Sequence, residues 1–373
     1  MPAGDRVRGR KSQPAKAEFG MKTRPGNFFE DFRLGEKIRH ATPRTITDGD
    51  CSLYIALTGS RHILHCARPV AHALGFRDRT VDDLLAFHIA FGKTVPDISL
   101  NAVANLGYAD VRFCTPCYPG DTLRAESEII GLKQNAGGKS GIVWVRSSAF
   151  NQNGEQVLSW ARWVMVHKRN AEAPAPKTVV PDLPQVVPVE RLNIPAFLNA
   201  ARFEPETTGS TDLWDDYDAG ERIDHPSGMT VDESDHTLAT RLYQNTARVH
   251  FDALAMKDTQ FGRRLMYGGH VISVCRALAY DGLENAISIA AINAGSHVSP
   301  AFAGDTLYAY TQVLEKWALP DRDDLGALRL RLTGVKNRRA SDISASMGAE
   351  GEHDPHVVLD LDYTVLMPCR GKT

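Results

Sequence analysis

The strongest constraint on this chain is that its sequence contains two copies of one unit. The segment EDFRLGEKIRHATPRTITDGD at 30–50 recurs as DDYDAGERIDHPSGMTVDESD at 215–235, at a constant offset of 185 residues. A second block, TPCYPGDTL at 115–123, recurs as SPAFAGDTL at 299–307, at an offset of 184. A shared turn motif would explain only the second block. Repetition on this scale predicts one structural unit used twice.

The copies are expected to span residues 21–170 and 214–373, with a proline-rich linker over 171–213. Proline-rich segments are stiff connectors. A linker of this length lets the second copy pack against the first about a pseudo-two-fold axis. Residues 1–20 are basic and contain no apolar segment, so they are interpreted as a disordered tail and not as a secretory signal.

Composition excludes several classes of partner. The 373 residues carry 43 basic and 45 acidic side chains, a net charge of −2. This balance gives no basic patch for nucleic acid or for an anionic membrane surface, and no apolar run is long enough to span a membrane. The six cysteines are too few and too scattered for a disulfide scaffold. They predict reduced thiols in a cytoplasmic protein.

Each copy shows the same order of predicted elements. A short strand and a helix come first, then an irregular segment that bears histidines. A longer apolar helix follows at 81–91 in the first copy and at 268–279 in the second. Three strands with period-2 alternation close each copy; they are expected at 122–131, 141–150, 156–166, 306–315, 326–335 and 357–366. This order predicts an α+β unit in which an antiparallel sheet wraps around one helix.

The motif order FEDF-x2-G-E, T-x2-D, TG-x5-H, apolar helix and RF-x2-P-x2-PGDTL resembles the MaoC-like hot-dog dehydratases, also called hydratase 2. The resemblance implies a double hot-dog fold and reversible addition of water to an enoyl-CoA, with no metal and no redox cofactor. Stretches 81–113, 242–252 and 264–283 resemble one branch of that family, the mesaconyl-CoA hydratases of the ethylmalonyl-CoA pathway. That branch implies mesaconyl-CoA as substrate and β-methylmalyl-CoA as product.

Both copies depart from the family pattern, which places an aspartate five residues before a histidine. His65 and His250 are kept, but Ser60 and Asn245 stand where the aspartate is expected. In the family, a glycine N–H at the start of the central helix, 18 residues after the histidine, stabilises the enolate. Gly268 fits that position in the second copy.

The first copy has a carboxylate at the position of Gly268, because Asp82 and Asp83 begin its central helix. A carboxylate is a good helix cap but would repel an enolate. The second copy is therefore predicted to be catalytic. We expect His250 to act as general base and acid, Asn245 to orient the water, and the Gly268 amide to form the oxyanion hole.

Basic side chains are the candidates for binding the charged parts of such a substrate. Arg248 or Arg61 is expected to pair with the second carboxylate of mesaconyl-CoA. Ser60 and His65 are expected to shape the pocket from the first copy. The candidates for the CoA phosphates precede the two central helices: Arg77, Arg79, Arg263 and Arg264.

Two other functions stay open on the sequence. A hot-dog thioesterase would use the same fold and ligand, with a carboxylate such as Asp82 or Asp83 near the central helix. A non-catalytic acyl-thioester-binding protein would explain why both copies lack the family aspartate. In either case a double hot-dog already mimics a dimer, and further pairing into a homodimer is expected.

Overall fold

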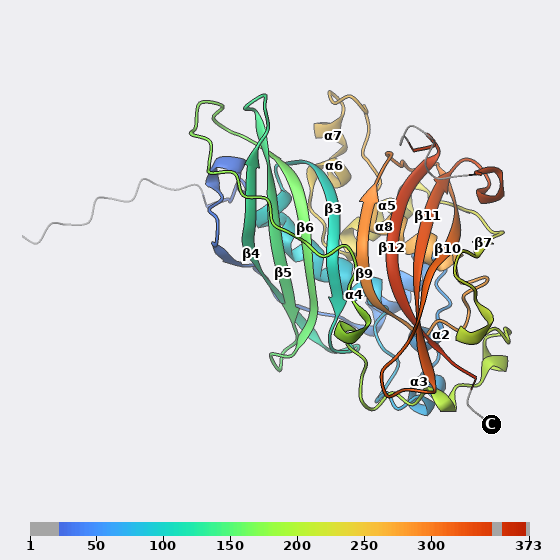
Figure 1. Cartoon of the computed structure of the whole chain (residues 1–373). Helices are drawn as coiled ribbons and strands as arrows, with labels where there is room; N and C mark the ends of the chain where they lie inside the picture. The colour runs from blue at the N-terminus through green and yellow to red at the C-terminus, as the bar shows by residue number, and fades with distance from the viewer. Residues whose placement is uncertain (1–21, 345–352, 371–373) are drawn as a thin grey trace, which may run out of the picture.

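The two copies share one continuous antiparallel sheet in a computed structural model, which describes residues 22–344 and 353–370 (Figure 1). The strand order is β1-β4-β5-β6-β3-β9-β12-β11-β10-β7, with β2 and β8 pairing at the edges. This sheet, with one central helix from each copy packed on it, has the predicted α+β double hot-dog architecture. The predicted basic tail, 1–20, lies outside the described residues.

The first copy follows the predicted order. Its strands are β1 (Lys37–Arg39), β2 (Arg44–Thr45), β3 (Ala102–Phe113), β4 (Thr122–Gln134), β5 (Ser140–Phe150) and β6 (Gln156–His167). Its helices are α1 (Asp48–Thr58), α2 (Ile63–Cys66), α3 (Arg68–Ala73) and the central α4 (Asp83–Thr94), which continues into a π-helical turn at Val95–Ser99. α1 begins with a capping box, in which the Thr47 hydroxyl accepts from the Asp50 amide and the Asp50 carboxylate accepts from the Thr47 amide.

The second copy repeats this arrangement. Its strands are β7 (Arg222–Asp224), β8 (Met229–Thr230), β9 (Ser288–His297), β10 (Thr306–Ala318), β11 (Leu325–Lys336) and β12 (Val357–Pro368). Its helices are α5 (Glu233–Leu242), α6 (Arg248–Phe251), α7 (Ala253–Met256) and the central α8 (Gly268–Leu278). The sequence analysis expected the histidine-bearing segments to be irregular. That expectation is wrong, because His65 lies in the short helix α2 and His250 in the short helix α6.

The copies are joined by β3 and β9, which the sequence analysis did not predict. They pair antiparallel, with Tyr108 opposite Gly295 and Arg112 opposite Ala291. Each of these strands is the last of its own half-sheet, so the pairing turns two sheets into one. A pseudo-two-fold axis between β3 and β9 therefore relates the copies, and each central helix begins close to the other copy's inner strand.

The two central helices lie on the same side of the sheet, in one shared hydrophobic core. All residues of α4 from Leu84 to Thr94 are buried. The close packing is visible at Gly92, where an added Cβ would lie 1.9 Å from the main-chain oxygen of Tyr243 in the second copy. Burial of apolar side chains from both copies in one core couples their stability.

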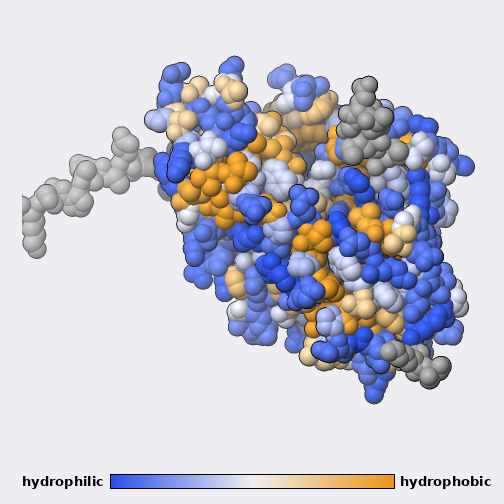
Figure 2. Space-filling model, in the orientation of Figure 1, coloured by the Kyte–Doolittle hydropathy of each residue, from blue (hydrophilic) through white to orange (hydrophobic). Residues whose placement is uncertain are grey.

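The segment between β6 and β7 crosses the face of the sheet that points away from the helices (Figure 1). It bridges to β4 through Val179 and Leu132 and donates from the Val187 amide to Asn293 on β9. Figure 2 shows apolar patches between charged side chains on this face. None of the helices in residues 22–344 and 353–370 has both the length and the apolar character needed to cross a bilayer.

Candidate functional site

The two central helices begin in chemically different ways. Asp82 caps α4, because its Oδ1 accepts from the Leu84 amide at 3.0 Å. Tyr267 occupies the same position before α8 and provides no side-chain cap. The first N–H groups of a helix have no partner within the helix and lie at the positive end of its dipole. The start of α8 can therefore accept an anion, whereas the start of α4 already holds a carboxylate.

His250 lies beside the uncapped start of α8. Its Nδ1 is 3.0 Å from the main-chain oxygen of Leu265, and its ring centre is 5.4 Å from that of Tyr267. A carbonyl oxygen only accepts hydrogen bonds, so Nδ1 carries the proton of the neutral ring and Nε2 keeps its lone pair. Burial, more than any other effect, lowers the pKa of His250 to about 4. The imidazole is neutral near pH 7 and has a basic nitrogen available.

Asn245 is buried in the turn before α6 and is held by the protein itself. Its Oδ1 accepts from the Ala247 amide at 3.1 Å, and its side chain interacts with the Tyr267 hydroxyl. These contacts fix the turn that carries His250 and the tyrosine before Gly268. The structure thus brings the predicted trio of Asn245, His250 and Gly268 together around the Tyr267 side chain. Their chemical roles remain predictions.

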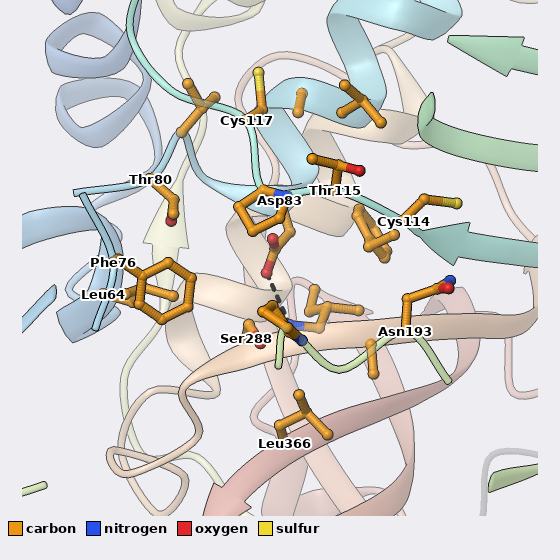
Figure 3. A pocket seen from close by; sticks show the side chains of 18 of the residues that line it. Leu64, Phe76, Thr80, Asp83, Cys114, Thr115, Cys117, Asn193, Ser288 and Leu366 are labelled. Carbon is orange, nitrogen blue, oxygen red and sulfur yellow. Dashed lines mark hydrogen bonds between the residues drawn. The ribbon is translucent and has the colours of Figure 1, made fainter. Parts of the chain in front are cut away.

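The equivalent cleft of the first copy contains an ion pair. Nε2 of His65 is 3.6 Å from Oδ2 of Asp83, and its Nδ1 is 2.8 Å from the Thr80 hydroxyl. Oδ2 of Asp83 also accepts from the amide of Ile289 on β9 at 2.8 Å, the contact drawn in Figure 3. Burial alone would lower the pKa of His65, but the Asp82 and Asp83 carboxylates outweigh it, and the pKa is raised. Both nitrogens of this histidine are thus engaged.

A cavity with about 590 Å³ of empty space, partly open to solvent, lies next to this ion pair (Figure 3). Its walls are mostly apolar and come from both copies, for example Phe76, Phe113 and Ile289. The linker closes part of it, because Asn193, Pro195 and Leu198 also line it. The neighbouring linker residue Phe197 packs its ring against Phe76 with centres 5.2 Å apart. In contrast, the segment around α7 beside the second copy's cleft is exposed, Leu254 to 73%.

The predicted binding residues of the first copy belong to this first cleft and not to the group around His250. The Ser60 hydroxyl donates to Asp82 at 3.3 Å. The guanidinium of Arg61 pairs with Asp281 at 2.8 Å and lies 4.4 Å from the ring centre of Tyr280. An interaction between Arg61 and a substrate carboxylate would have to break this pair.

The other predicted arginines differ in whether an acid already holds them. Arg264 pairs with Glu233, Arg79 with Asp48 at 2.5 Å, and Arg77 with Asp121 at 3.6 Å. Arg263 instead stacks 4.0 Å from the centre of the Phe302 ring. Among the described residues, neither Arg263 nor the exposed Arg248 has a carboxylate within salt-bridge distance. These two cations of the second copy are the ones available to a ligand.

Sequence reasoning missed two side chains at the second cleft, His297 on β9 and Tyr108 on β3. Nε2 of His297 is 3.3 Å from the Tyr108 hydroxyl. An added Cβ on Gly268 would lie only 2.3 Å from that same Nε2. The repeat itself carried a signal, because the offset of 184 aligns His297 with Phe113 in the first copy.

Comparisons with known proteins agree on one group. The sequence model described as mesaconyl-CoA hydratase matches residues 17–349. The chain is 58% identical over 350 residues to the β-methylmalyl-CoA dehydratase of Chloroflexus aurantiacus, which covers 94% of this chain and 99% of that protein. It is 53% identical over 348 residues to the mesaconyl-CoA hydratase of Cereibacter sphaeroides, covering 93% and 100%.

Two solved structures share the fold. A MaoC domain protein from Chloroflexus aurantiacus superposes with a TM-score of 0.91 at 57% identity, over 94% of this chain and all of that one. A protein from Mycobacterium tuberculosis with a double hotdog fold superposes with a TM-score of 0.71 at 24% identity, over 92% and 99%. The second likeness concerns the fold alone.

Proposed function

Because the chain belongs to the mesaconyl-CoA hydratase family, we propose that it adds water reversibly to mesaconyl-CoA and forms β-methylmalyl-CoA. Mesaconyl-CoA carries a methyl group on C2 and a carboxylate on C3 of its double bond. The thioester carbonyl withdraws electrons from C3, which therefore accepts the water oxygen. Addition passes through a thioester enolate, so the site must supply a base and a place for negative charge.

The second copy supplies both groups. Nε2 of His250 takes a proton from water while the water oxygen bonds to C3. The electron pair of the double bond moves towards the thioester oxygen, whose negative charge lies at the Gly268 amide and the positive end of α8. The imidazolium then returns the proton to C2. One water has been added, His250 is neutral again, and no step requires a metal or an electron carrier.

The observation that carries this assignment is the contrast between the two helix starts. α8 begins without a side-chain cap, next to a histidine whose Nε2 is unprotonated. α4 begins with two aspartates, which satisfy the Leu84 and Ile289 amides. A developing enolate would be stabilised at α8 and repelled at α4.

The charged ends of the substrate fit Arg248 and Arg263, two arginines of the second copy that no carboxylate among the described residues holds. Arg248 lies on α6 with His250, two residues away, and is exposed. We assign it to the substrate carboxylate on C3. Arg263, in the loop before α8, is assigned to the CoA phosphates. The absence of an acid at position 245 fits an acyl group that carries a free carboxylate, because a second carboxylate there would repel it.

Mass spectrometry of the protein incubated with mesaconyl-CoA tests this function, with crotonyl-CoA as a substrate that lacks the second carboxylate. We expect mesaconyl-CoA to gain the mass of one water with no release of free thiol. Release of CoA thiol would identify a thioesterase. Binding of both esters without any change in mass would identify an acyl-thioester-binding protein.

Location and assembly form part of the same proposal. All six cysteines are free thiols, which fits a reducing compartment such as the cytoplasm. Apolar patches on the linker-bearing face (Figure 2) fit the pairing of two copies. Sedimentation or light scattering is expected to give twice the mass of the 41.0 kDa chain.

A further inference from the structure

His250 and one amide are too few for the proposed reaction. General base catalysis contributes about 10²–10⁴-fold, and one oxyanion-hole donor about 10²–10³-fold. Their product of about 10⁴–10⁷ reaches only the lower end of enzymatic rate enhancements. The family aspartate that would add to this is absent from both copies. A further donor beside Gly268 would raise this product.

The tip of the His297 imidazole packs against Gly268, the first residue of α8. Its Nε2, Cε1 and Cδ2 atoms lie 2.3, 2.5 and 2.7 Å from the place where a Cβ on Gly268 would be. Any side chain at 268 would displace the ring, so glycine permits this approach. The imidazole tip thus lies against the first residue of the uncapped helix, where the enolate oxygen is expected.

The first copy shows what a cleft without this imidazole contains. At the aligned positions it has Asp83 in place of Gly268 and Phe113 in place of His297. The two positions differ together between the copies. The first copy pairs a carboxylate with a phenyl ring, and the second pairs a glycine with an imidazole. Asp83 and Phe113 both line the cavity of the first copy.

Tyr108 from the first copy's β3 holds the ring in place. Its hydroxyl is 3.3 Å from Nε2, and the two ring centres are 5.9 Å apart in an edge-to-face contact. A separation of 3.3 Å is long for this type of hydrogen bond, so a proton on Nε2 is only weakly bound to the Tyr108 oxygen and can also be donated to a ligand oxygen. Burial lowers the pKa of His297 to about 4 and raises that of the Tyr108 phenol. Both groups are neutral near pH 7, the state in which an imidazole donates a hydrogen bond without losing its proton.

We propose that His297 is a catalytic residue that donates a hydrogen bond from Nε2 to the thioester oxygen, beside the Gly268 amide, while Tyr108 positions its ring. The inference rests on the proposed hydration and adds the second donor of the oxyanion hole. The cleft is then built from both copies, because the ring belongs to β9 and its support to β3.

The test compares His297→Phe, which introduces the first copy's residue, with His297→Gln, which retains a side-chain N–H donor. We expect His297→Phe to lower kcat for mesaconyl-CoA by about 10²–10³-fold, with KM changed by less than about threefold. His297→Gln is expected to retain at least a tenth of the wild-type kcat, on the order expected for a displaced donor. Tyr108→Phe should lower kcat by less than His297→Phe does.

A second measurement isolates the enolate from the hydration step. 2-Methylsuccinyl-CoA has no double bond but can exchange its C2 proton in D2O through the corresponding enolate, which lacks only the C3 hydroxyl. His297→Phe should slow this exchange by the same factor as kcat and leave the affinity for this ester unchanged. Wild-type rates of turnover and exchange in a folded His297→Phe protein would overturn the inference. If His297→Phe does not fold, a His297→Gln protein that has lost both activities would overturn it.

The proposed function and this inference fail in different ways. If the wild-type protein leaves mesaconyl-CoA unchanged, both the proposed function and the role of His297 are refuted. If the wild-type protein hydrates it and His297→Phe is equally active, only the role of His297 is refuted.

Discussion

The contact between Gly268 and His297 gives a prediction about stability that is independent of any assay of turnover. In Gly268→Ala the new methyl would lie 2.3 Å from the imidazole Nε2. Real contacts cannot be that short, so the ring must move, and overpacking of this kind costs about 1–3 kcal/mol. Alanine returns up to about 1 kcal/mol through its higher helix propensity. We therefore expect a net loss of about 0–3 kcal/mol in the free energy of unfolding.

The second variant, His297→Ala, removes the ring and leaves space that the new methyl can enter. In the double variant the clash disappears. Its destabilisation should be smaller than the sum of the two single values by about 1–2 kcal/mol, within the range found for residues in contact.

Urea unfolding followed by circular dichroism measures this coupling, provided that the three variants and the wild type share one m-value. Additivity within about 0.5 kcal/mol would show that the two residues do not touch. The close approach on which the second oxyanion donor depends would then be refuted.

Three further predictions concern packing, acid stability and CoA binding. Gly92→Ala would place a methyl 1.9 Å from the main-chain oxygen of Tyr243, and relief of this clash would shift α4 against the second copy. Thermal denaturation should show that the free energy of unfolding falls by more than about 3 kcal/mol. The control is the turn variant Gly137→Ala, whose added methyl would have no atom within 4 Å and which should match the wild type. Acid titration of stability should show unfolding on the acid side of pH 6.5, because burial lowers the pKa of four fully buried imidazoles to about 3 or 4. These imidazoles belong to His88, His225, His236 and His270. The unfolded chain binds protons there that the folded chain does not, so their contribution to stability is fully present above pH 6.5 and falls towards pH 4, by about 1.4 kcal/mol per imidazole at about pH 5.5. Unchanged stability at that pH would contradict this prediction. Arg263→Met should raise KM for CoA esters by about tenfold, the value of one charge-assisted contact. Arg264→Met should raise KM less, because Arg264 is already paired with Glu233. Equal effects of the two substitutions would show that Arg263 is not the phosphate ligand.

The elements of each half could be predicted where the apolar pattern was long and regular. The strands expected at 141–150 and 357–366 are β5 (Ser140–Phe150) and β12 (Val357–Pro368). The central helix expected at 268–279 is α8 (Gly268–Leu278). In all three, long apolar or alternating runs mark the element in the sequence, and this signal needs no tertiary information.

The strands that join the halves were missed for a physical reason. β9, with the sequence SIAAINAGSH, is rich in Ala, Gly and Asn, which are poor strand formers. β3 contains Ala and Gly as well, and its pairing with β6 is interrupted by register shifts. Both strands are defined by tertiary pairing across the pseudo-two-fold axis. Small residues are needed there because rings from the neighbouring strand pack on them, as Trp163 of β6 does on Gly107.

The candidate site was predicted only as far as local spacing reaches. His250 and Gly268 are linked through Leu265 and Tyr267, neighbours in sequence that the structure also brings together. His297 lies on a missed strand and Tyr108 in the other copy, so no local pattern could connect them with Gly268. The cap on α4 was anticipated from Asp82, but the closure of the first cleft by linker residues depends on tertiary packing.

The most direct test of the account is the turnover of mesaconyl-CoA by His250→Ala and His65→Ala, each compared with the wild type after circular dichroism has shown that the protein is folded. Loss of the base should lower kcat of His250→Ala by about 10²–10⁴-fold. His65→Ala removes the ion pair with Asp83 but no base, so its kcat should stay within about tenfold of the wild-type value. Turnover that survives in His250→Ala but is abolished in His65→Ala would contradict the account and assign the reaction to the first copy.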